Sequence, residues 1–117
     1  MDIESIRMYC ISKKAVIECM PFDDKTLVFK VAGKIFALAA LDAYPLRLNL
    51  KCDPEKAIDL RERFESVRPG YHSNKKHWNT IELNGEISQE DLYKLIDHSY
   101  NLVVVKLTKK VRKNNLL

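Results

Sequence analysis

Strict alternation of apolar and polar residues predicts a β-strand at "LRLNLK", residues 46–51. Leucine occupies every second position, and the charged or amide residues between fall on the opposite side. A period of two is that of a strand with one buried and one solvated face. The preceding run "TLVFKVAGKIFALAALD", residues 26–42, predicts two further strands. Ala32–Gly33 interrupts this run, and glycine permits the positive φ of a tight hairpin turn.

Three helices are predicted by a different period, in which apolar residues recur every three or four positions. Residues 2–14 place their apolar side chains on one face. Residues 52–65 begin with an aspartate N-cap and a proline, and "SQED" at residues 88–91 has the serine-x-x-acid form of a helix start. The pattern leaves open whether "LVVVKL", residues 102–107, extends the last helix or turns back as a strand, since its β-branched run opposes the helical period.

These elements predict an α+β fold with the order α-β-β-β-α-β-β-α. An antiparallel sheet with helices packed mainly on one face, a two-layer sandwich, accounts for this order economically. The strand "KIFALAAL", residues 34–41, is apolar after its lysine, so both of its faces are expected to be buried. The expected faces are Ile35, Ala37 and Ala39 on one side and Phe36, Leu38 and Ala40 on the other.

Composition predicts one domain over residues 1–117, in which residues 106–117 form a basic C-terminal tail. With 46% apolar and 31% charged residues, a chain of this length buries roughly two thirds of its extended surface and needs neither metal nor disulfides to fold. Its three cysteines are far apart and no secretory signal is visible, which predicts a cytoplasmic protein. No apolar run approaches the ~18 residues of a membrane span.

The net charge of +4 is unevenly distributed along the chain. Residues 1–97 contain 15 basic and 16 acidic side chains, whereas residues 98–117 contain 5 basic and none acidic. A basic end of this kind attracts nucleic acid, anionic lipid or an acidic protein, or simply keeps the chain in solution. Charge alone does not choose among these.

The most distinctive stretch is "RPGYHSNKKHWN", residues 68–79, which joins cations, histidines and aromatic residues without an acid. Pro69 and Gly70 predict a loop that leads into the strand "WNTIEL". Cations bind phosphates, and flat rings stack on bases with roughly 1–3 kcal/mol per base on single strands. The alternative is that Tyr71 and Trp78 pack inside while the lysines only solvate the loop.

This stretch predicts weak, largely sequence-nonspecific DNA binding, with RNA as an open alternative. Lys30 and Lys34 flank the other predicted hairpin and are expected to supply a second contact. If four cations contact phosphates, raising the salt concentration from 50 to 200 mM should lower the affinity on the order of a hundredfold. The predicted contact residues are Lys30, Lys34, Arg68, Tyr71, His72, Asn74, Lys75, Lys76, His77 and Trp78, with Lys109, Lys110, Arg112 and Lys113 of the tail as a secondary set.

Two other classes of function compete with nucleic-acid binding. The apolar strand at residues 34–41 also suits a protein-interaction or chaperone-like module, either a monomer or a weak homodimer. His72 and His77 have a spacing seen in zinc sites, but no cysteine pair has ligand spacing, so no metal site is predicted. With 3 glycines the chain has no phosphate-binding loop or nucleophile elbow, so neither a cofactor nor an enzymatic activity is expected.

A family resemblance is carried by six segments, which are "KVAGKIFAL", "LKCDPE", "LRERFE", "PGYHSNKKHWN", "SYNLVV" and "KLTKKVRK". In this order and at similar separations they resemble the bacterial MmcQ/YjbR family of small cytoplasmic proteins. The specific part is "YHSNKKHWN", in which Ser73 stands where family members commonly carry methionine. The resemblance implies a two-layer fold like that of secretion chaperones, and DNA binding through a double-wing arrangement of hairpins.

Overall fold

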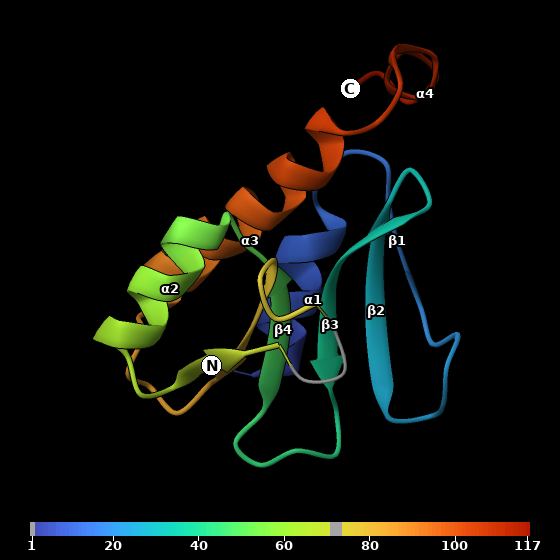
Figure 1. Cartoon of the computed structure of the whole chain (residues 1–117). Helices are drawn as coiled ribbons and strands as arrows, with labels where there is room; N and C mark the ends of the chain where they lie inside the picture. Colours follow the sequence, from blue (N-terminus) through green and yellow to red (C-terminus); the bar gives the residue numbers. More distant parts are fainter. Residues whose placement is uncertain (1, 71–73) are drawn as a thin grey trace.

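The computed structural model describes residues 2–70 and 74–117 of the chain. Within these ranges the chain folds into a sheet packed against a layer of helices (Figure 1). The helices are α1 (Ile3–Ile11), α2 (Pro54–Arg63), α3 (Gln89–Val105) and α4 (Lys109–Asn114), and the strands are β1 (Val16–Cys19), β2 (Thr26–Val31), β3 (Lys34–Ala40), β4 (Arg47–Lys51), β5 (Val67–Pro69) and β6 (Trp78–Glu82).

The strands of the described residues form one antiparallel sheet in the order β1-β2-β3-β4-β6-β5. Helix α3 lies on β2, β3 and β4, while α1 contacts β1 and α2 contacts β5. Buried residues of these three helices share one core with one side of the sheet. The predicted α+β fold, two layers with helices on one face, is therefore confirmed. We call the other side of the sheet, which carries Arg47, Asn49 and Thr80, the open face.

The alternation predicted at residues 46–51 is present in β4. Leu48 and Leu50 are buried, whereas Arg47 is exposed. Leu48 lies opposite Ala39 on one side and Ile81 on the other, so an apolar row crosses the sheet under the helix layer. Burial of such rows supplies the main favourable contribution to folding.

One expectation for β3 is wrong, because this strand contains a β-bulge. Its register against β2 shifts within the hairpin, so one extra residue is inserted. Phe36 therefore joins Ala37 on the helix side, where its ring meets the Tyr100 ring of α3 edge-on at 5.4 Å. Leu38 stays on the open face, opposite Asn49 of β4. The simple alternation that placed Phe36 with Leu38 breaks at this bulge.

Two elements, β1 and α4, are missing from the order predicted by the sequence, and a third, β5, lies where the sequence predicts a loop. In β1, Glu18 points toward the helix layer, because Arg7 of α1 donates two hydrogen bonds to its carboxylate at 2.6 and 2.7 Å. Its neighbour Ile17 is 60% exposed. This inverted polarity hides the strand from a pattern search. The segment at residues 102–107, for which the sequence leaves helix and strand open, continues α3 as far as Val105, because Val103 packs in the core.

The predicted starts and turns are confirmed. The side chain of Asp53 caps α2, and that of Ser88 caps α3 by accepting from the Asp91 N–H at 3.1 Å. Ala32 and Gly33 both have positive φ, as a two-residue hairpin turn requires. In the described ranges no helix combines the length and the apolar character needed to cross a membrane.

Candidate nucleic-acid interface

The turn that precedes β6 is held by backbone hydrogen bonds from two directions. The side-chain oxygen of Asn74 accepts from the Lys76 N–H at 2.9 Å, and its carbonyl accepts from the Trp78 N–H at 2.9 Å. Arg61 of α2 donates to the Lys75 carbonyl, also at 2.9 Å. Asn74 is thus a turn residue, as predicted. Because these bonds fix the backbone, the exposed side chains of Lys75 and Lys76 project from a defined position.

Trp78 begins β6 and lies on the open face of the sheet. Its neighbour Asn79 points into the helix layer, where its amide donates to the Ala57 carbonyl, so the strand alternation turns the indole the other way. The indole is half-buried and does not belong to the helix-covered core. Lys51 of β4 lies directly opposite it. Trp78 and Lys51 therefore lie at the same end of the sheet.

A cationic recess of about 220 Å³ lies where β3 begins and where β4 and α3 end. Burial, reinforced by the nearby Lys106 charge, lowers the pKa of Lys51 below its ordinary value. Like charges are therefore held together here at some cost to the protein. The recess is lined by three lysines, Lys34, Lys51 and Lys106, and by three apolar residues, Ile35, Val103 and Leu107.

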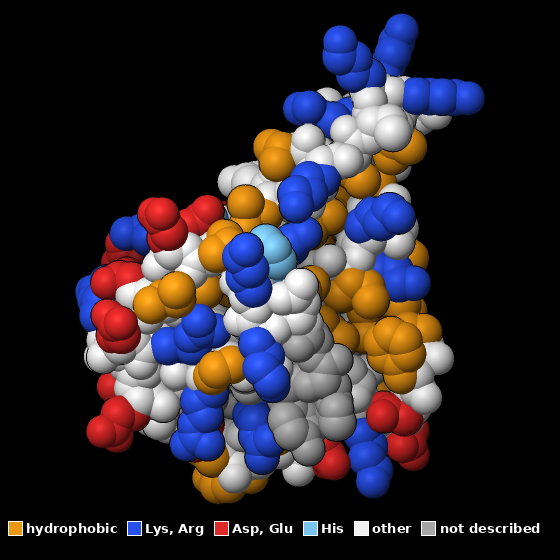
Figure 2. All heavy atoms as spheres, in the orientation of Figure 1, with side chains coloured by type: hydrophobic (Ala, Val, Ile, Leu, Met, Phe, Trp, Pro, Cys, Tyr) orange, Lys and Arg blue, Asp and Glu red, His pale blue; other side chains and the backbone are white. Residues whose placement is uncertain are grey.

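The cationic recess and the turn before β6 meet where Lys51 lies opposite Trp78, and together they make one basic strip. Figure 2 shows Lys and Arg side chains gathered over the middle of this view and around α4 at the top. Acidic side chains gather mainly over α2 and near the lower edge. The basic strip consists of Lys34, Lys51, Lys75, Lys76 and Lys106, and Trp78 lies opposite Lys51.

The ammonium groups of the basic strip have no carboxylate within 4 Å among residues 2–70 and 74–117. All ion pairs found in these ranges involve other cations. The Lys75 ammonium donates instead to the Gly70 carbonyl at 3.2 Å, which leaves its charge uncompensated. The strip is therefore suited to an anionic ligand. The paired cations are Arg7, Lys13, Arg63 and Lys94.

Two predicted contact residues lie apart from the basic strip. Arg68 on β5 lines a separate recess of about 250 Å³ on the open face, together with Arg47 and Glu82. Lys30 on β2 is half-buried opposite Ile35, while Lys34 lines the cationic recess. The two lysines of the β2–β3 hairpin therefore diverge, and only one of them joins the strip.

The other predicted contact residues differ in their location and exposure. Tyr71 and His72 lie outside the described residues. His77 is half-buried, and its carbonyl accepts from the Cys52 N–H at 2.7 Å, which continues the pairing of β4 with β6. The predicted tail folds in part into α4, which follows the recess residue Leu107 along the chain. On α4, Lys109, Lys110 and Lys113 are exposed and Arg112 is half-buried.

Three residues of this region are missing from the sequence prediction. The sequence places Lys51 only on the solvent side of its strand and Lys106 only in the basic tail. The sequence predicts the strand that holds Lys51 and the strand that holds Trp78, but it does not predict that these two strands pair. Arg61 carries no local signal, because the carbonyl it binds lies 14 residues further along the chain.

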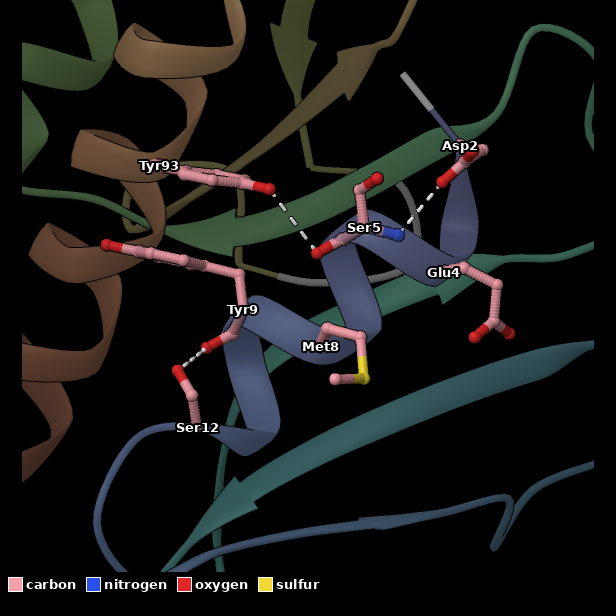
Figure 3. A pocket seen from close by; sticks show the side chains of 7 residues that line it. All are labelled: Asp2, Glu4, Ser5, Met8, Tyr9, Ser12 and Tyr93. Carbon is pink, nitrogen blue, oxygen red and sulfur yellow. Dashed lines mark hydrogen bonds between the residues drawn. The ribbon is translucent and has the colours of Figure 1, made fainter.

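A groove between α1 and α3 has the opposite character (Figure 3). It has a volume of about 520 Å³, and the rings of Tyr9 and Tyr93 stack beside it at 3.8 Å. The Tyr93 hydroxyl donates to the Ser5 carbonyl at 3.4 Å. Asp2 and Glu4 also line the groove. Because its carboxylates repel anions and its tyrosines bond within the protein, this groove is not part of the basic interface.

A cysteine and a histidine near the start of α2 form a neutral, structural cluster. The Asp53 N–H donates to His98 Nε2 at 3.1 Å, which requires an unprotonated nitrogen. Burial, with a smaller effect of Lys56, lowers the pKa of His98, and burial raises the pKa of Cys52 to about 11. Among the residues that the structure describes, no three His, Cys, Asp or Glu side chains gather as metal ligands would.

Comparison with known proteins gives a match to the YjbR family over residues 11–102. The chain belongs to the YjbR family. Two relatives from Escherichia coli support this membership: the uncharacterized protein YbdF of strain O157:H7 and the uncharacterized protein YjbR of strain K12. YbdF is 45% identical over 96 residues, covering 81% of this chain and 78% of YbdF. YjbR is 34% identical over 113 residues, covering 97% of this chain and 96% of YjbR.

Solved structures extend the YjbR-family likeness to the fold. The Deinococcus radiodurans protein DR2400 superimposes with a TM-score of 0.94 at 43% identity, covering 98% of this chain and 88% of DR2400. A protein from Pseudomonas syringae gives a TM-score of 0.76 at 26% identity, covering 87% and 98% respectively. The family membership predicted from the six sequence segments is thus confirmed.

Proposed function

We propose that this YjbR-family chain binds DNA weakly and with little sequence preference, and that it does so without catalysing a reaction. The observation that carries the proposal is the basic strip, whose ammonium groups lack carboxylate partners among the described residues and in which Lys51 lies opposite the half-buried Trp78. Cations held together without partners attract a polyanion. Phosphates would neutralise them, and the indole offers a face to an unstacked base.

The composition of the basic strip supports sequence-independent contacts. Its charges are lysine ammonium groups, which bind phosphates as point charges, whereas base recognition favours the planar fork of arginine. Lys34 comes from the β2–β3 hairpin, and Lys75 and Lys76 come from the turn before β6. We interpret these two turns as the two wings of a double-wing arrangement.

The Lys75→Gln, Lys76→Gln double variant tests this proposal in a polarisation titration with a labelled DNA duplex. Two lost phosphate contacts lower affinity by roughly 60-fold at about 0.1 M salt. The matched control is Lys94→Gln, because Lys94 is exposed on α3 and pairs with Glu90 outside the strip. The control is expected to bind as the wild type does. The proposal would be contradicted if the double variant and the Lys94→Gln control lost the same amount of DNA affinity. It would also be contradicted if the wild type did not bind DNA at low salt.

A second candidate function is a protein-interaction module that pairs two copies of this chain. The observation that favours it is the edge strand β1, beside which Ile17 and Phe22 are 60% and 65% exposed. An edge strand with apolar neighbours pairs readily with another strand. Light scattering of wild type and Ile17→Lys tests this: a dimer that the variant abolishes supports the candidate, and a monomer at all concentrations excludes it.

A further inference from the structure

The charge of the cationic recess matches a phosphate monoester better than a phosphate within a strand. Lys34, Lys51 and Lys106 line one recess and have no carboxylate within 4 Å in the described part of the chain. A phosphate monoester carries a charge of about −1.5 to −2 near pH 7, and its oxygens are strong acceptors. A phosphodiester carries a single charge. Three ammonium groups therefore favour the monoester.

The size of the recess limits what it encloses. Its volume is about 220 Å³, below the ~300–1,000 Å³ of pockets that enclose a whole drug-sized ligand. A phosphate with its attached sugar fits this space and leaves the base outside. Ile35, Val103 and Leu107 supply apolar surface for the sugar carbons. Because Val103 is buried in the core, the recess closes against α3 and suits the end of a strand.

The strand pairing makes an aromatic residue a neighbour of the recess residue Lys51. Lys51 lines the recess and also lies directly opposite Trp78 on the open face. Trp78 is therefore separated from the recess by a single residue of the sheet, Lys51. The carbonyls at the end of α3 carry partial negative charge. Those of Val103 and Val104 accept from the Lys106 and Leu107 N–H groups at 3.2 and 3.1 Å, so they are occupied within the protein.

We propose that the cationic recess binds the phosphorylated end of a nucleic-acid strand. The terminal phosphate lies among Lys34, Lys51 and Lys106, and the adjacent base stacks on Trp78. Lys75 and Lys76 contact the phosphates that follow. This assignment rests on the proposed function and adds to it a preference for one chemical group, the phosphate monoester.

The test compares two single-stranded oligonucleotides of identical sequence that end in a 5′-phosphate or a 5′-hydroxyl. Wild type is expected to bind the phosphorylated strand roughly 5- to 10-fold more tightly at about 0.1 M salt. Lys51→Gln is expected to remove the preference, so that the two strands bind with equal affinity. Lys76→Gln is expected to weaken both strands equally and keep the preference. The exposed Lys106→Gln repeats the Lys51 test with little risk to folding.

The outcomes separate this proposal from the proposed function. Equal affinity of the wild type for both strands overturns the end preference and leaves general DNA binding intact. Failure of both strands to bind overturns both proposals. Millimolar inorganic phosphate and a nucleoside monophosphate serve as competitors. Loss of the preference with either competitor supports monoester recognition, and an undiminished preference with both overturns it.

Discussion

Two half-buried lysines, Lys13 and Lys51, lie in opposite electrostatic surroundings. The Lys13 ammonium pairs with the Asp97 carboxylate and lies 5.0 Å from the centroids of two tyrosine rings. Lys51 lies near Lys106 and opposite Trp78, with no carboxylate within 4 Å among the described residues. The fold itself compensates the first charge. The second is left for a ligand to compensate.

The same difference separates two regions of the protein. Around α1, Arg7 binds the Glu18 carboxylate through two hydrogen bonds, and the Tyr9 hydroxyl donates to Asp97 at 2.6 Å. Burial, followed by this bond to Asp97, raises the pKa of Tyr9 to about 12. The basic strip has no such partners. Substitutions near α1 should therefore change stability, and substitutions in the strip should change binding.

The largest expected effect is on DNA binding, in a variant with Lys51, Lys75, Lys76 and Lys106 all changed to Gln. Four lost phosphate contacts lower affinity on the order of 1,000-fold at about 0.1 M salt. The free energy of unfolding should stay the same or rise, because repulsion between Lys51 and Lys106 is removed. Polarisation titrations and urea denaturation measure the two quantities. A marked loss of stability would show that these lysines are structural.

Lys13→Met should lower stability and leave DNA affinity nearly unchanged, the reverse of the strip variant. Loss of the ion pair with Asp97 and of two cation–π contacts lowers the free energy of unfolding by about 1–2 kcal/mol, since Asp97 is partly exposed. Affinity for DNA should stay within twofold of wild type. Urea denaturation checks the first expectation. Lys14→Met is the matched control, because the side chain of Lys14 is exposed at the next position.

Arg61→Met tests the link between α2 and the turn before β6. Stability and DNA affinity should both decrease modestly in this variant. Arg61 donates to the Lys75 carbonyl at 2.9 Å and to Asn79 Oδ1 at 3.2 Å. Losing these bonds should cost about 1 kcal/mol of stability and weaken DNA binding slightly by loosening the turn. Arg63→Met, two residues further on the exposed side of α2, should leave binding unchanged. If Arg63→Met weakens binding as much, the turn is not the cause.

The smallest effect concerns His98, which the fold keeps neutral. Its pKa is lowered by burial, so the unfolded chain takes up a proton at higher pH than the folded chain does. Stability should therefore fall as pH drops below about 6.5, and level off below the folded pKa. His98→Gln supplies an oxygen acceptor to the Asp53 N–H without a titrating ring. Chemical denaturation between pH 7.5 and 5.5 should show a weaker pH dependence in this variant.

The fold was largely predictable because its signals are local. Leucine alternation in β4, the Asp53 and Ser88 caps, and the Ala32–Gly33 turn are all readable within a few residues. The failures involve partners distant in sequence. The strand β1 is hidden because Glu18 faces a helix, and the bulge in β3 is visible only in the pairing with β2.

The candidate site was predictable only in part, for the same reason. The residues near 74–78 are contiguous, so their composition indicates a basic, aromatic surface. Lys51 joins them through pairing of β4 with β6, and Lys106 joins them through the end of α3. Arg68 and Lys30 carry the right charge but lie elsewhere in the sheet. Charge was visible in the sequence, whereas its grouping depended on strand order.

The salt dependence of DNA affinity tests the central claim, that the basic strip is where phosphates bind. Five contacts predict a slope of log affinity against log salt of about −4.5 on a duplex, and Lys51→Gln with Lys106→Gln should reduce it to about −2.7. Lys13→Met should leave the slope unchanged. A wild-type slope near zero, or one that Lys13→Met lowers as much as the strip variant does, would contradict the account.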